Sequence, residues 1–198
     1  MDFSTVLAGV AGVLGIVGFI IYNRKPSDSS FRPSIATWGI WAFVAVLNLR
    51  SYSAMSKDLV TSILPAIGTL FCIATFIGVI FRGKITALKC YDIASLALGI
   101  AGVVAGKLWS STHANLVVQG ALAIGYVPTY VIVVKSPKEE RSLPWFVWAG
   151  AYLMQLFVIG LRWQGNYAVL AYPVLEAANC LCVGLLARRA MRGKINPA

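Results

Sequence analysis

Long apolar runs, each near the length of a membrane-spanning helix, dominate this sequence. A helix that crosses a lipid bilayer needs about 20 mostly apolar residues. Seven segments approach this length, and together they cover most of the chain: Phe3 to Tyr22, Ser34 to Leu49, Leu59 to Phe81, Tyr91 to Leu108, Leu116 to Val134, Leu143 to Leu161 and Tyr167 to Ala187. We therefore expect an all-α integral membrane protein with seven transmembrane helices and short connections.

The composition agrees with this expectation. Of the 198 residues, 59% are hydrophobic and 12% are charged, whereas a soluble domain has roughly 45–50% apolar and about 25% charged residues. This difference excludes a soluble enzyme, a disordered tail and a secreted disulfide scaffold. The four cysteines show neither a disulfide framework nor the spacing of a zinc site, so no metal or other cofactor is expected.

Lys and Arg residues are unevenly shared between the two sides of the predicted bundle. One side holds four of them, Arg50, Lys57, Lys107 and Arg162, and the other holds thirteen: Arg24, Lys25, Arg32, Arg82, Lys84, Lys89, Lys135, Lys138, Arg141, Arg188, Arg189, Arg192 and Lys194. Cytoplasmic loops carry the excess of positive charge. We therefore expect the N-terminus outside and the C-terminus in the cytoplasm. Short loops without glycosylation sequons favour a bacterial inner membrane.

The chain contains an internal repeat. Two tryptophans followed by an amide residue occur in the second segment and again, with the same spacing, in the sixth: Trp38, Trp41 and Asn48, then Trp145, Trp148 and Gln155. A proline followed by a cysteine seven residues later occurs in both the third and the seventh segments: Pro65 and Cys72, then Pro173 and Cys180. The two pairs of segments are separated by nearly the same length of chain. Helices one to three therefore correspond to helices five to seven.

This repeat predicts a three-one-three arrangement. Residues 1–81 form the first three-helix repeat, residues 82–113 a linker transmembrane helix, and residues 114–198 the second repeat with a basic cytoplasmic tail. Because a single helix separates the two units, both enter the membrane in the same direction. Parallel repeats related by an axis along the membrane normal are a known transporter plan, with the substrate site near the midplane between the halves.

A short motif agrees with that plan. The run Gly125-Tyr126-Val127-Pro128-Thr129, followed by Lys135-Ser136-Pro137, resembles the Pro-Gln motif and trailing basic turn of the SWEET and PQ-loop superfamily of small-solute transporters, with Thr129 in place of Gln. The three-one-three layout resembles the same superfamily over nearly the whole chain. Its sugar transporters carry a Pro-Asn pair where this chain has Pro65-Ala66 and Pro173-Val174. The resemblance therefore implies a small-solute carrier without indicating a sugar.

One ionisable residue lies deep within an apolar segment. Glu176 is near the middle of the seventh segment, and Asn179 follows on the same helical face. Ionisable side chains inside a bilayer are costly and usually face a cavity or a partner. We expect Glu176 to bind and release a proton coupled to transport, and Asn179 to line the substrate path. The alternative is a structural glutamate, neutral and hydrogen-bonded to a neighbouring helix.

The second and sixth helices carry matching stripes of aromatic and amide side chains. Trp41 and Asn48 share one helical face, as do Trp148 and Gln155. If the stripes face each other, they offer aromatic planes and amides to a substrate. Asn48 and Gln155 lie toward the outer ends of their helices, where an extracellular gate is the alternative. The remaining tryptophans of the two stripes are expected to be interfacial anchors: Trp38 and Trp145.

The whole pattern predicts a small-solute carrier that works by alternating access between the two repeats. Prolines that interrupt helical hydrogen bonding are the expected hinges: Pro65, Pro128 and Pro173. The expected partners are the lipid bilayer, protons and a solute of the sugar, amino acid, nucleoside or vitamin class, with no nucleic acid; a homo-oligomer is left open. A receptor or scaffold that binds a peptide or lipid, and an ion channel, are the alternatives on this architecture. No nucleophile–base pair or metal constellation is visible, so we expect no enzyme.

Overall fold

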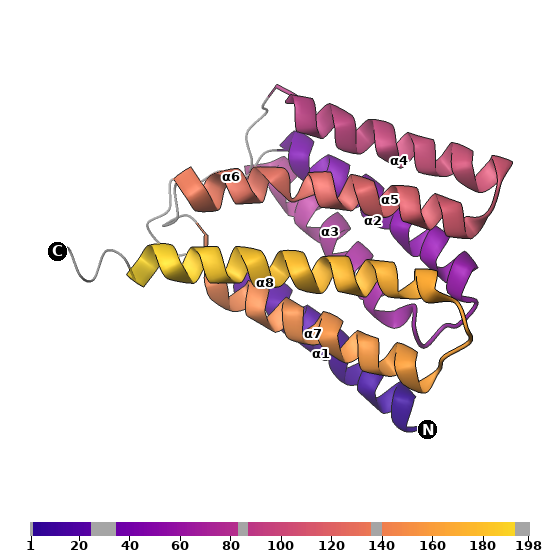
Figure 1. Ribbon diagram of the computed structural model, residues 1–198. Helices are drawn as coiled ribbons and strands as arrows, with labels where there is room; N and C mark the ends of the chain where they lie inside the picture. The colour runs from indigo at the N-terminus through magenta and orange to yellow at the C-terminus, as the bar shows by residue number, and fades with distance from the viewer. Residues whose placement is uncertain (1, 25–34, 83–86, 136–139, 193–198) are drawn as a thin grey trace.

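The fold was obtained as a computed structural model that describes residues 2–24, 35–82, 87–135 and 140–192. All regular structure in these ranges is helical, as the sequence predicts. The helices run side by side along one axis (Figure 1). They are α1 (Phe3–Asn23), α2 (Ile35–Ser56), α3 (Ile63–Arg82), α4 (Cys90–Leu108), α5 (Ser111–Gly125), α6 (Val127–Lys135), α7 (Ser142–Leu161), the 3-10 helix η2 (Tyr167–Leu170) and α8 (Ala171–Arg192).

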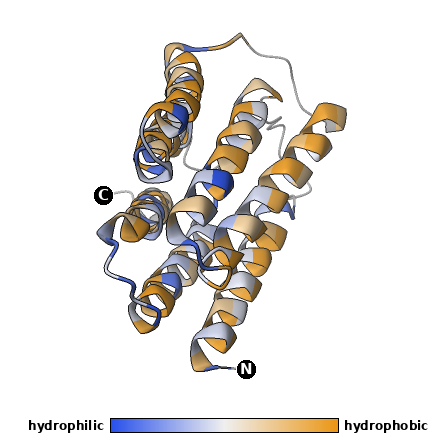
Figure 2. Ribbon diagram, turned by 90° about the vertical axis from the view of Figure 1, so that its right-hand side faces the viewer, coloured by the Kyte–Doolittle hydropathy of each residue, from blue (hydrophilic) through white to orange (hydrophobic). Residues whose placement is uncertain are grey.

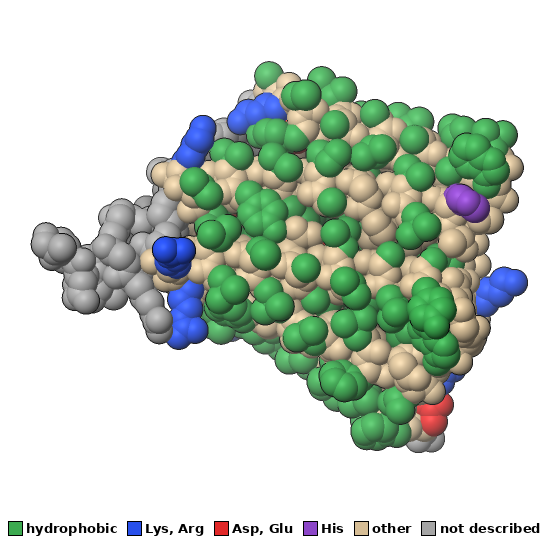
Figure 3. Space-filling view, viewed as in Figure 1, with side chains coloured by type: hydrophobic (Ala, Val, Ile, Leu, Met, Phe, Trp, Pro, Cys, Tyr) green, Lys and Arg blue, Asp and Glu red, His purple; other side chains and the backbone are tan. Residues whose placement is uncertain are grey.

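Most of these helices have the length and composition of membrane spans. Six segments of the described chain qualify: Phe3–Asn23, Ile63–Phe81, Cys90–Leu108, Ser111–Lys135, Ser142–Leu161 and Tyr167–Arg189. The helices α5 and α6 together form one of them. Apolar residues are spread over the outside of the bundle (Figures 2 and 3), as they are on a surface that faces lipid. The chain is therefore built as an integral membrane protein.

Helix α2 is absent from the candidate spans of the described chain, and several of its polar residues are buried inside the bundle. The side chain of Asn48 is buried, and its Oδ1 accepts hydrogen bonds from Asn115 Nδ2 (3.2 Å) and Gln119 Nε2 (2.9 Å) of α5. Ser51 Oγ accepts a third bond from Asn115 Nδ2 at 3.1 Å. Polar groups paired between helices in this way do not face lipid.

Some observed helix ends differ from the predicted ones, and the same polar cluster accounts for the longer α2 and α5. Four helix ends differ from expectation by four residues or more: α2 continues to Ser56 beyond Leu49, α3 begins at Ile63 and not Leu59, α5 begins at Ser111 and not Leu116, and α8 continues to Arg192 beyond Ala187. Counting apolar residues ends a segment at a polar residue, whereas a helix continues where that residue finds a partner inside the bundle. Ser34, the expected start of the second span, lies outside the described residues.

The two ends of the bundle differ in charge. We call the end where α1 and α8 finish the basic end, because Lys and Arg side chains gather there beside the C-terminus (Figure 3). The opposite end holds the start of α1, the α2–α3 connection and the end of α7, and we call it the N-terminal end. Five of the thirteen predicted basic residues lie outside the described residues: Lys25, Arg32, Lys84, Lys138 and Lys194.

The helices pack in a regular order. Helix α3 packs against both α1 and α2, and α8 packs against both α7 and the α5–α6 pair. Between these groups, α1 packs against α7 and α2 packs against α5. Helix α4 packs on α5 and α2 and thus lies outside both groups (Figure 1). A central space is left where the two groups meet.

Candidate functional site

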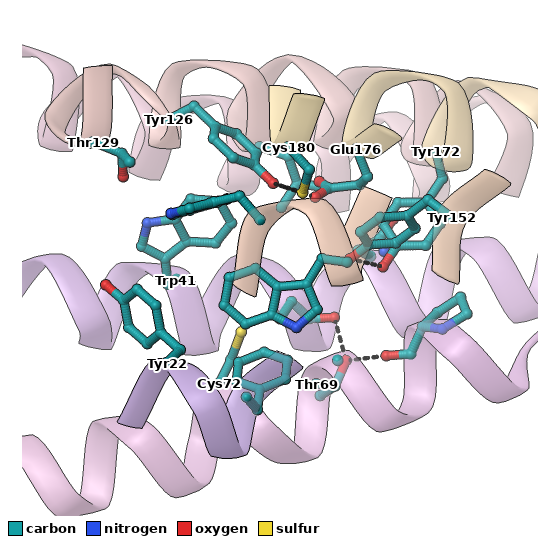
Figure 4. A pocket seen from close by; sticks show the side chains of 18 of the residues that line it. Tyr22, Trp41, Thr69, Cys72, Tyr126, Thr129, Tyr152, Tyr172, Glu176 and Cys180 are labelled. Carbon is teal, nitrogen blue, oxygen red and sulfur yellow. Dashed lines mark hydrogen bonds between the residues drawn. The ribbon is translucent and has the colours of Figure 1, made fainter. Parts of the chain in front are cut away.

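A pocket occupies this central space. It encloses about 740 Å³ of empty space, including the part that is open to solvent. Every long helix except α4 contributes to its lining: Phe19, Tyr22, Trp38, Trp41, Ala45, Asn48, Pro65, Gly68, Thr69, Cys72, Leu122, Tyr126, Thr129, Trp145, Trp148, Tyr152, Tyr172, Glu176 and Cys180. Figure 4 shows the pocket from close by.

The pocket extends toward the basic end and is closed toward the N-terminal end. Its lining reaches Tyr22 in the last turn of α1 and Trp38 in the first turn of α2, and both side chains are partly exposed. In the opposite direction, Tyr52 and Gln155 are both fully buried between the lining and the N-terminal end. The pocket is therefore nearer to the surface toward the basic end than toward the N-terminal end.

Glu176 supplies the acidic group of the pocket. Its side chain is 4% exposed, and its Oε2 accepts a hydrogen bond from the Tyr126 hydroxyl at 2.6 Å. Its second oxygen, Oε1, has no hydrogen-bond partner among the described residues. Figure 4 shows the carboxyl group beside Tyr126 and Cys180, across the pocket from Thr69 and Cys72. One oxygen of a buried carboxyl group is thus left for a ligand or a proton.

Aromatic rings make up much of the remaining wall. Trp41 meets Tyr126 edge to face, with ring centroids 5.2 Å apart. Trp148 packs against Phe19 at 4.7 Å and against Trp145 at 5.1 Å. Such edge-to-face and tilted pairs fix the ring planes. The pocket therefore presents flat, apolar surfaces in set orientations.

Two tryptophans at corresponding positions of the repeat make equivalent contacts. A side chain added at Gly18 would overlap the Trp148 indole, and one added at Gly125 would lie 3.2 Å from Trp41 Cζ2. Gly18 and Gly125 are separated by the same length of chain as Trp41 and Trp148. Each tryptophan thus packs over a glycine of a helix in the other group, α7 over α1 and α2 over α5.

The polar residues of the pocket break this equivalence. Four of them come from the second half of the chain, and the corresponding positions of the first half hold residues that cannot replace them: Tyr126 corresponds to Phe19, Tyr152 to Ala45, Tyr172 to Leu64, and Glu176 to Gly68. The Tyr152 and Tyr172 hydroxyls lie 3.3 Å apart. Aromatic residues from both halves therefore line the pocket, whereas these four polar residues all come from the second half.

Three of the five predicted substrate-binding residues line the pocket, namely Trp41, Asn48 and Trp148. Asn179 does not belong to the lining; its Oδ1 accepts a hydrogen bond from the Tyr130 hydroxyl at 2.8 Å. Gln155 also lies outside it. The two tryptophans expected to be interfacial anchors belong to the lining instead, and Trp145 is only 6% exposed.

Gln155 takes part in closing the N-terminal end. Its Nε2 donates a hydrogen bond to the Thr61 carbonyl oxygen at 2.6 Å. The Tyr52 hydroxyl donates to the Val169 carbonyl oxygen at 3.3 Å. Thr61 lies just before α3 and Val169 just before α8. Each bond joins one half of the chain to the other, and we call this pair the clasp.

An ion-pair network lies beyond the clasp at the same end. Arg162, at the end of α7, pairs with Asp58 (Nε to Oδ2, 2.5 Å) and with Asp2 (Nη1 to Oδ2, 3.1 Å). Its Nη1 also donates to Ser4 Oγ at 3.0 Å. Hydrogen bonds from the side chain and backbone of Thr5 hold the pKa of Asp2 well below its usual value, with a smaller contribution from Arg162. The network joins α1, α7 and the α2–α3 connection.

The three predicted hinge prolines have different surroundings. Pro65 and Pro173 are each the third residue of their helices, α3 and α8, where a missing N–H is tolerated. Pro128 is the second residue of α6, next to the interruption at Tyr126 within the span Ser111–Lys135. Pro128 thus lies beside a break inside a candidate span, and Pro173 follows the change from η2 to α8 inside the span Tyr167–Arg189.

The sequence analysis missed the tyrosines beside Glu176. Tyr172 precedes Glu176 by four residues, so helical spacing could have placed it on the same face. Tyr126 lies on a different helix and corresponds to Phe19 in the first half. Its hydrogen bond to Glu176 depends on how α5 and α8 pack, and no pattern in the sequence signals it.

The described residues hold no group of three or more His, Cys, Asp or Glu side chains that could bind a metal ion. All four cysteines are free. The chain matches no protein-family model, no curated protein and no solved structure. The geometry of the pocket is therefore the basis for a function.

Proposed function

We propose that this protein is a small-solute membrane transporter that works by alternating access between two parallel three-helix repeats. Helices α1–α3 form the first repeat, α4 is the linker, and α5–α8 form the second. Helix α2 is the seventh span, and the N-terminus lies outside. This arrangement resembles that of the SWEET and PQ-loop superfamily.

The order of helix packing supports the two repeats. In both groups the last helix packs against the other two, as α3 does with α1 and α2, and α8 with α5–α6 and α7. The contacts between the groups are reciprocal, α1 with α7 and α2 with α5. The paired contacts of Trp148 with Gly18 and Trp41 with Gly125 follow the same relation. A twofold axis along the bundle would produce all of these features.

The observation that carries the proposal is a pocket that lies between the two groups and is closed toward the N-terminal end. The clasp and the Arg162 network close the N-terminal end with contacts between segments of both halves. A movement of one repeat against the other would break these contacts and open that end. Rocking of this kind around a fixed central site is how alternating access works.

Glu176 is the group proposed to couple transport to protons. It is buried in the centre of the pocket, where Tyr126 donates a hydrogen bond to its Oε2 and the Tyr152 hydroxyl also interacts with the carboxyl group. Ionisable residues inside a bundle mark ion and proton pathways. When the pocket faces alternate sides, a proton bound to Glu176 would cross with the movement or exchange against the solute.

Counterflow in proteoliposomes tests the proposal. Vesicles with the full chain and preloaded with one solute from a panel of sugars, amino acids, nucleosides and vitamins should accumulate the same labelled solute, with saturation. Glu176→Gln should reduce this uptake, whereas Asp92→Asn should not, because Asp92 is a buried acid that caps α4 outside the pocket.

The outcomes separate the alternatives. Binding of a peptide or a lipid without uptake of any solute would contradict transport and favour a receptor or scaffold. Uptake that does not saturate would favour a channel.

A further inference from the structure

We infer that the solute is an organic monocation, a compact ammonium or ring-shaped cation that binds between the aromatic walls with its positive charge at Glu176 Oε1. This inference rests on the proposed function for the movement of the solute, but not for its binding. It names the substrate class of the same pocket.

The first argument is that no positively charged side chain of the pocket lining balances the carboxyl group of Glu176. The lining contains no Lys, Arg or His. Titratable groups that face Glu176 from α3, α5, α7 and α8 are neutral hydroxyls and thiols: Cys72, Tyr126, Tyr152, Tyr172 and Cys180. An ionised carboxyl group buried without a positive partner is strongly unfavourable. A cationic ligand would supply the missing partner.

The second argument is the unused oxygen. Tyr126 holds Oε2, whereas Oε1 has no partner among the described residues although the side chain is only 4% exposed. An unpaired buried acceptor is unfavourable and usually has an explanation. A ligand that brings a proton donor or a positive charge would satisfy this oxygen.

The third argument is that several donors of the pocket are already engaged. Thr69 Oγ1 donates to the backbone carbonyls of Ala45 and Pro65, which are both 2.9 Å away. Trp148 Nε1 donates to Gly15 O at 3.2 Å, and Trp145 Nε1 to Glu140 Oε1 at 2.7 Å. A sugar or an anion would need such donors. A cation uses acceptors and ring faces instead, and the pocket offers both at Glu176 and its aromatic walls.

The aromatic walls complete the match. Trp41, Trp148 and Tyr22 line the pocket on the side of its mouth (Figure 4 labels Trp41 and Tyr22). Ring faces attract a cation within about 6 Å of the ring centre, most strongly where water is excluded. A proton and the cation would then be alternative partners of Glu176, and this competition would couple their movements in opposite directions.

A matched pair of probes tests the inference. The full chain in detergent is titrated by calorimetry with choline, with its neutral isostere 3,3-dimethylbutan-1-ol, and with phenyltrimethylammonium. We expect the cations to bind at least about tenfold more tightly than the neutral alcohol. In Glu176→Gln the cations should lose this advantage, while Asp92→Asn should retain it.

Equal binding of choline and its isostere would overturn the inference without any variant. So would unchanged cation binding in Glu176→Gln, or no binding of either cation. Counterflow separates this result from the proposed function. Uptake of neutral solutes alone would support transport but contradict the inference that the solute is a cation. Binding of cations without any uptake would support the cation site but contradict the proposal that the protein is a transporter.

Discussion

At the scale of single residues, Gly18 sets how closely helix α1 approaches the Trp148 indole. A Cβ atom at this position would overlap the ring, whereas one at Gly9 of the same helix would meet nothing within 4 Å. Overpacking costs about 1–3 kcal/mol, and replacing a helical glycine by alanine otherwise gains roughly 0.5–1 kcal/mol. We expect Gly18→Ala to lower the thermal midpoint and Gly9→Ala to raise it slightly. Equal midpoints for the two variants would contradict the close contact.

Glu140 makes the stability of the protein depend on pH. It precedes α7 and is 7% exposed, and burial raises its pKa from 4.5 to about 7 although Trp145 donates a hydrogen bond to it. Between these two values the folded state holds more protons than the unfolded state. The contribution of Glu140 to the free energy of unfolding should therefore be greatest in acid and fall as the pH rises toward 7, by up to about 3 kcal/mol.

Comparison with Glu140→Gln isolates this contribution. The amide keeps the hydrogen bond from Trp145 and has no charge to titrate. Thermal midpoints of the two proteins measured from acid to neutral pH should differ most in their slope, with the variant less sensitive. The same slope in both would show that Glu140 titrates as it does in the unfolded chain.

The residues of the pocket differ in how far the sequence could predict them. Trp41 and Trp148 belong to stripes that repeat, and the repeat placed them facing the same space. Tyr126 and the free oxygen of Glu176 emerge only from the contact between α5 and α8. A stripe fixes which residues share a helical face, but the partner across that face depends on tertiary packing.

At the scale of helices, two of the predicted prolines remove helical hydrogen bonds at positions where other side chains bind the freed carbonyl groups. The missing N–H of Pro65 leaves the Thr61 carbonyl without its helical donor, and the missing N–H of Pro173 does the same to Val169. These two carbonyls accept the clasp hydrogen bonds from Gln155 and Tyr52. The sequence predicts the missing helical bonds and suggests hinges. It does not reveal the side chains that use the freed carbonyls.

Helix α2 shows the same limit for the fold. The seven apolar runs predict the helices and their order well, but α2 ends at Ser56, two turns beyond the expected end at Leu49. Its buried Asn48 and Ser51 count against a span in any average of hydropathy, although both are paired with α5. A hydropathy value describes each residue in isolation. In the bundle, a buried polar residue is stabilised by its hydrogen-bond partner on another helix.

At the scale of the whole molecule, the arrangement corresponds to one of the two states that the proposed alternating access would require. The pocket extends toward the basic end, and the clasp together with the Arg162 network closes the N-terminal end. Both sets of contacts are polar, and they join segments that the proposed movement would separate. Their total strength should set how often the closed end opens, because polar contacts between membrane helices are worth only about 0.6–2 kcal/mol each.

Cys72 offers a native reporter for this opening, since it lines the pocket and is 9% exposed. With the other three cysteines replaced, a membrane-impermeant thiol reagent should label Cys72 readily from the basic end and slowly from the N-terminal end. Asp58→Asn removes the charge that holds Arg162 and should speed labelling from the N-terminal end severalfold. Ser95→Ala is the matched control, because it removes a buried hydrogen bond to Ala121 between α4 and α5 and leaves the closure intact. If both variants label at the rate of the parent, the Arg162 network does not hold the pocket closed.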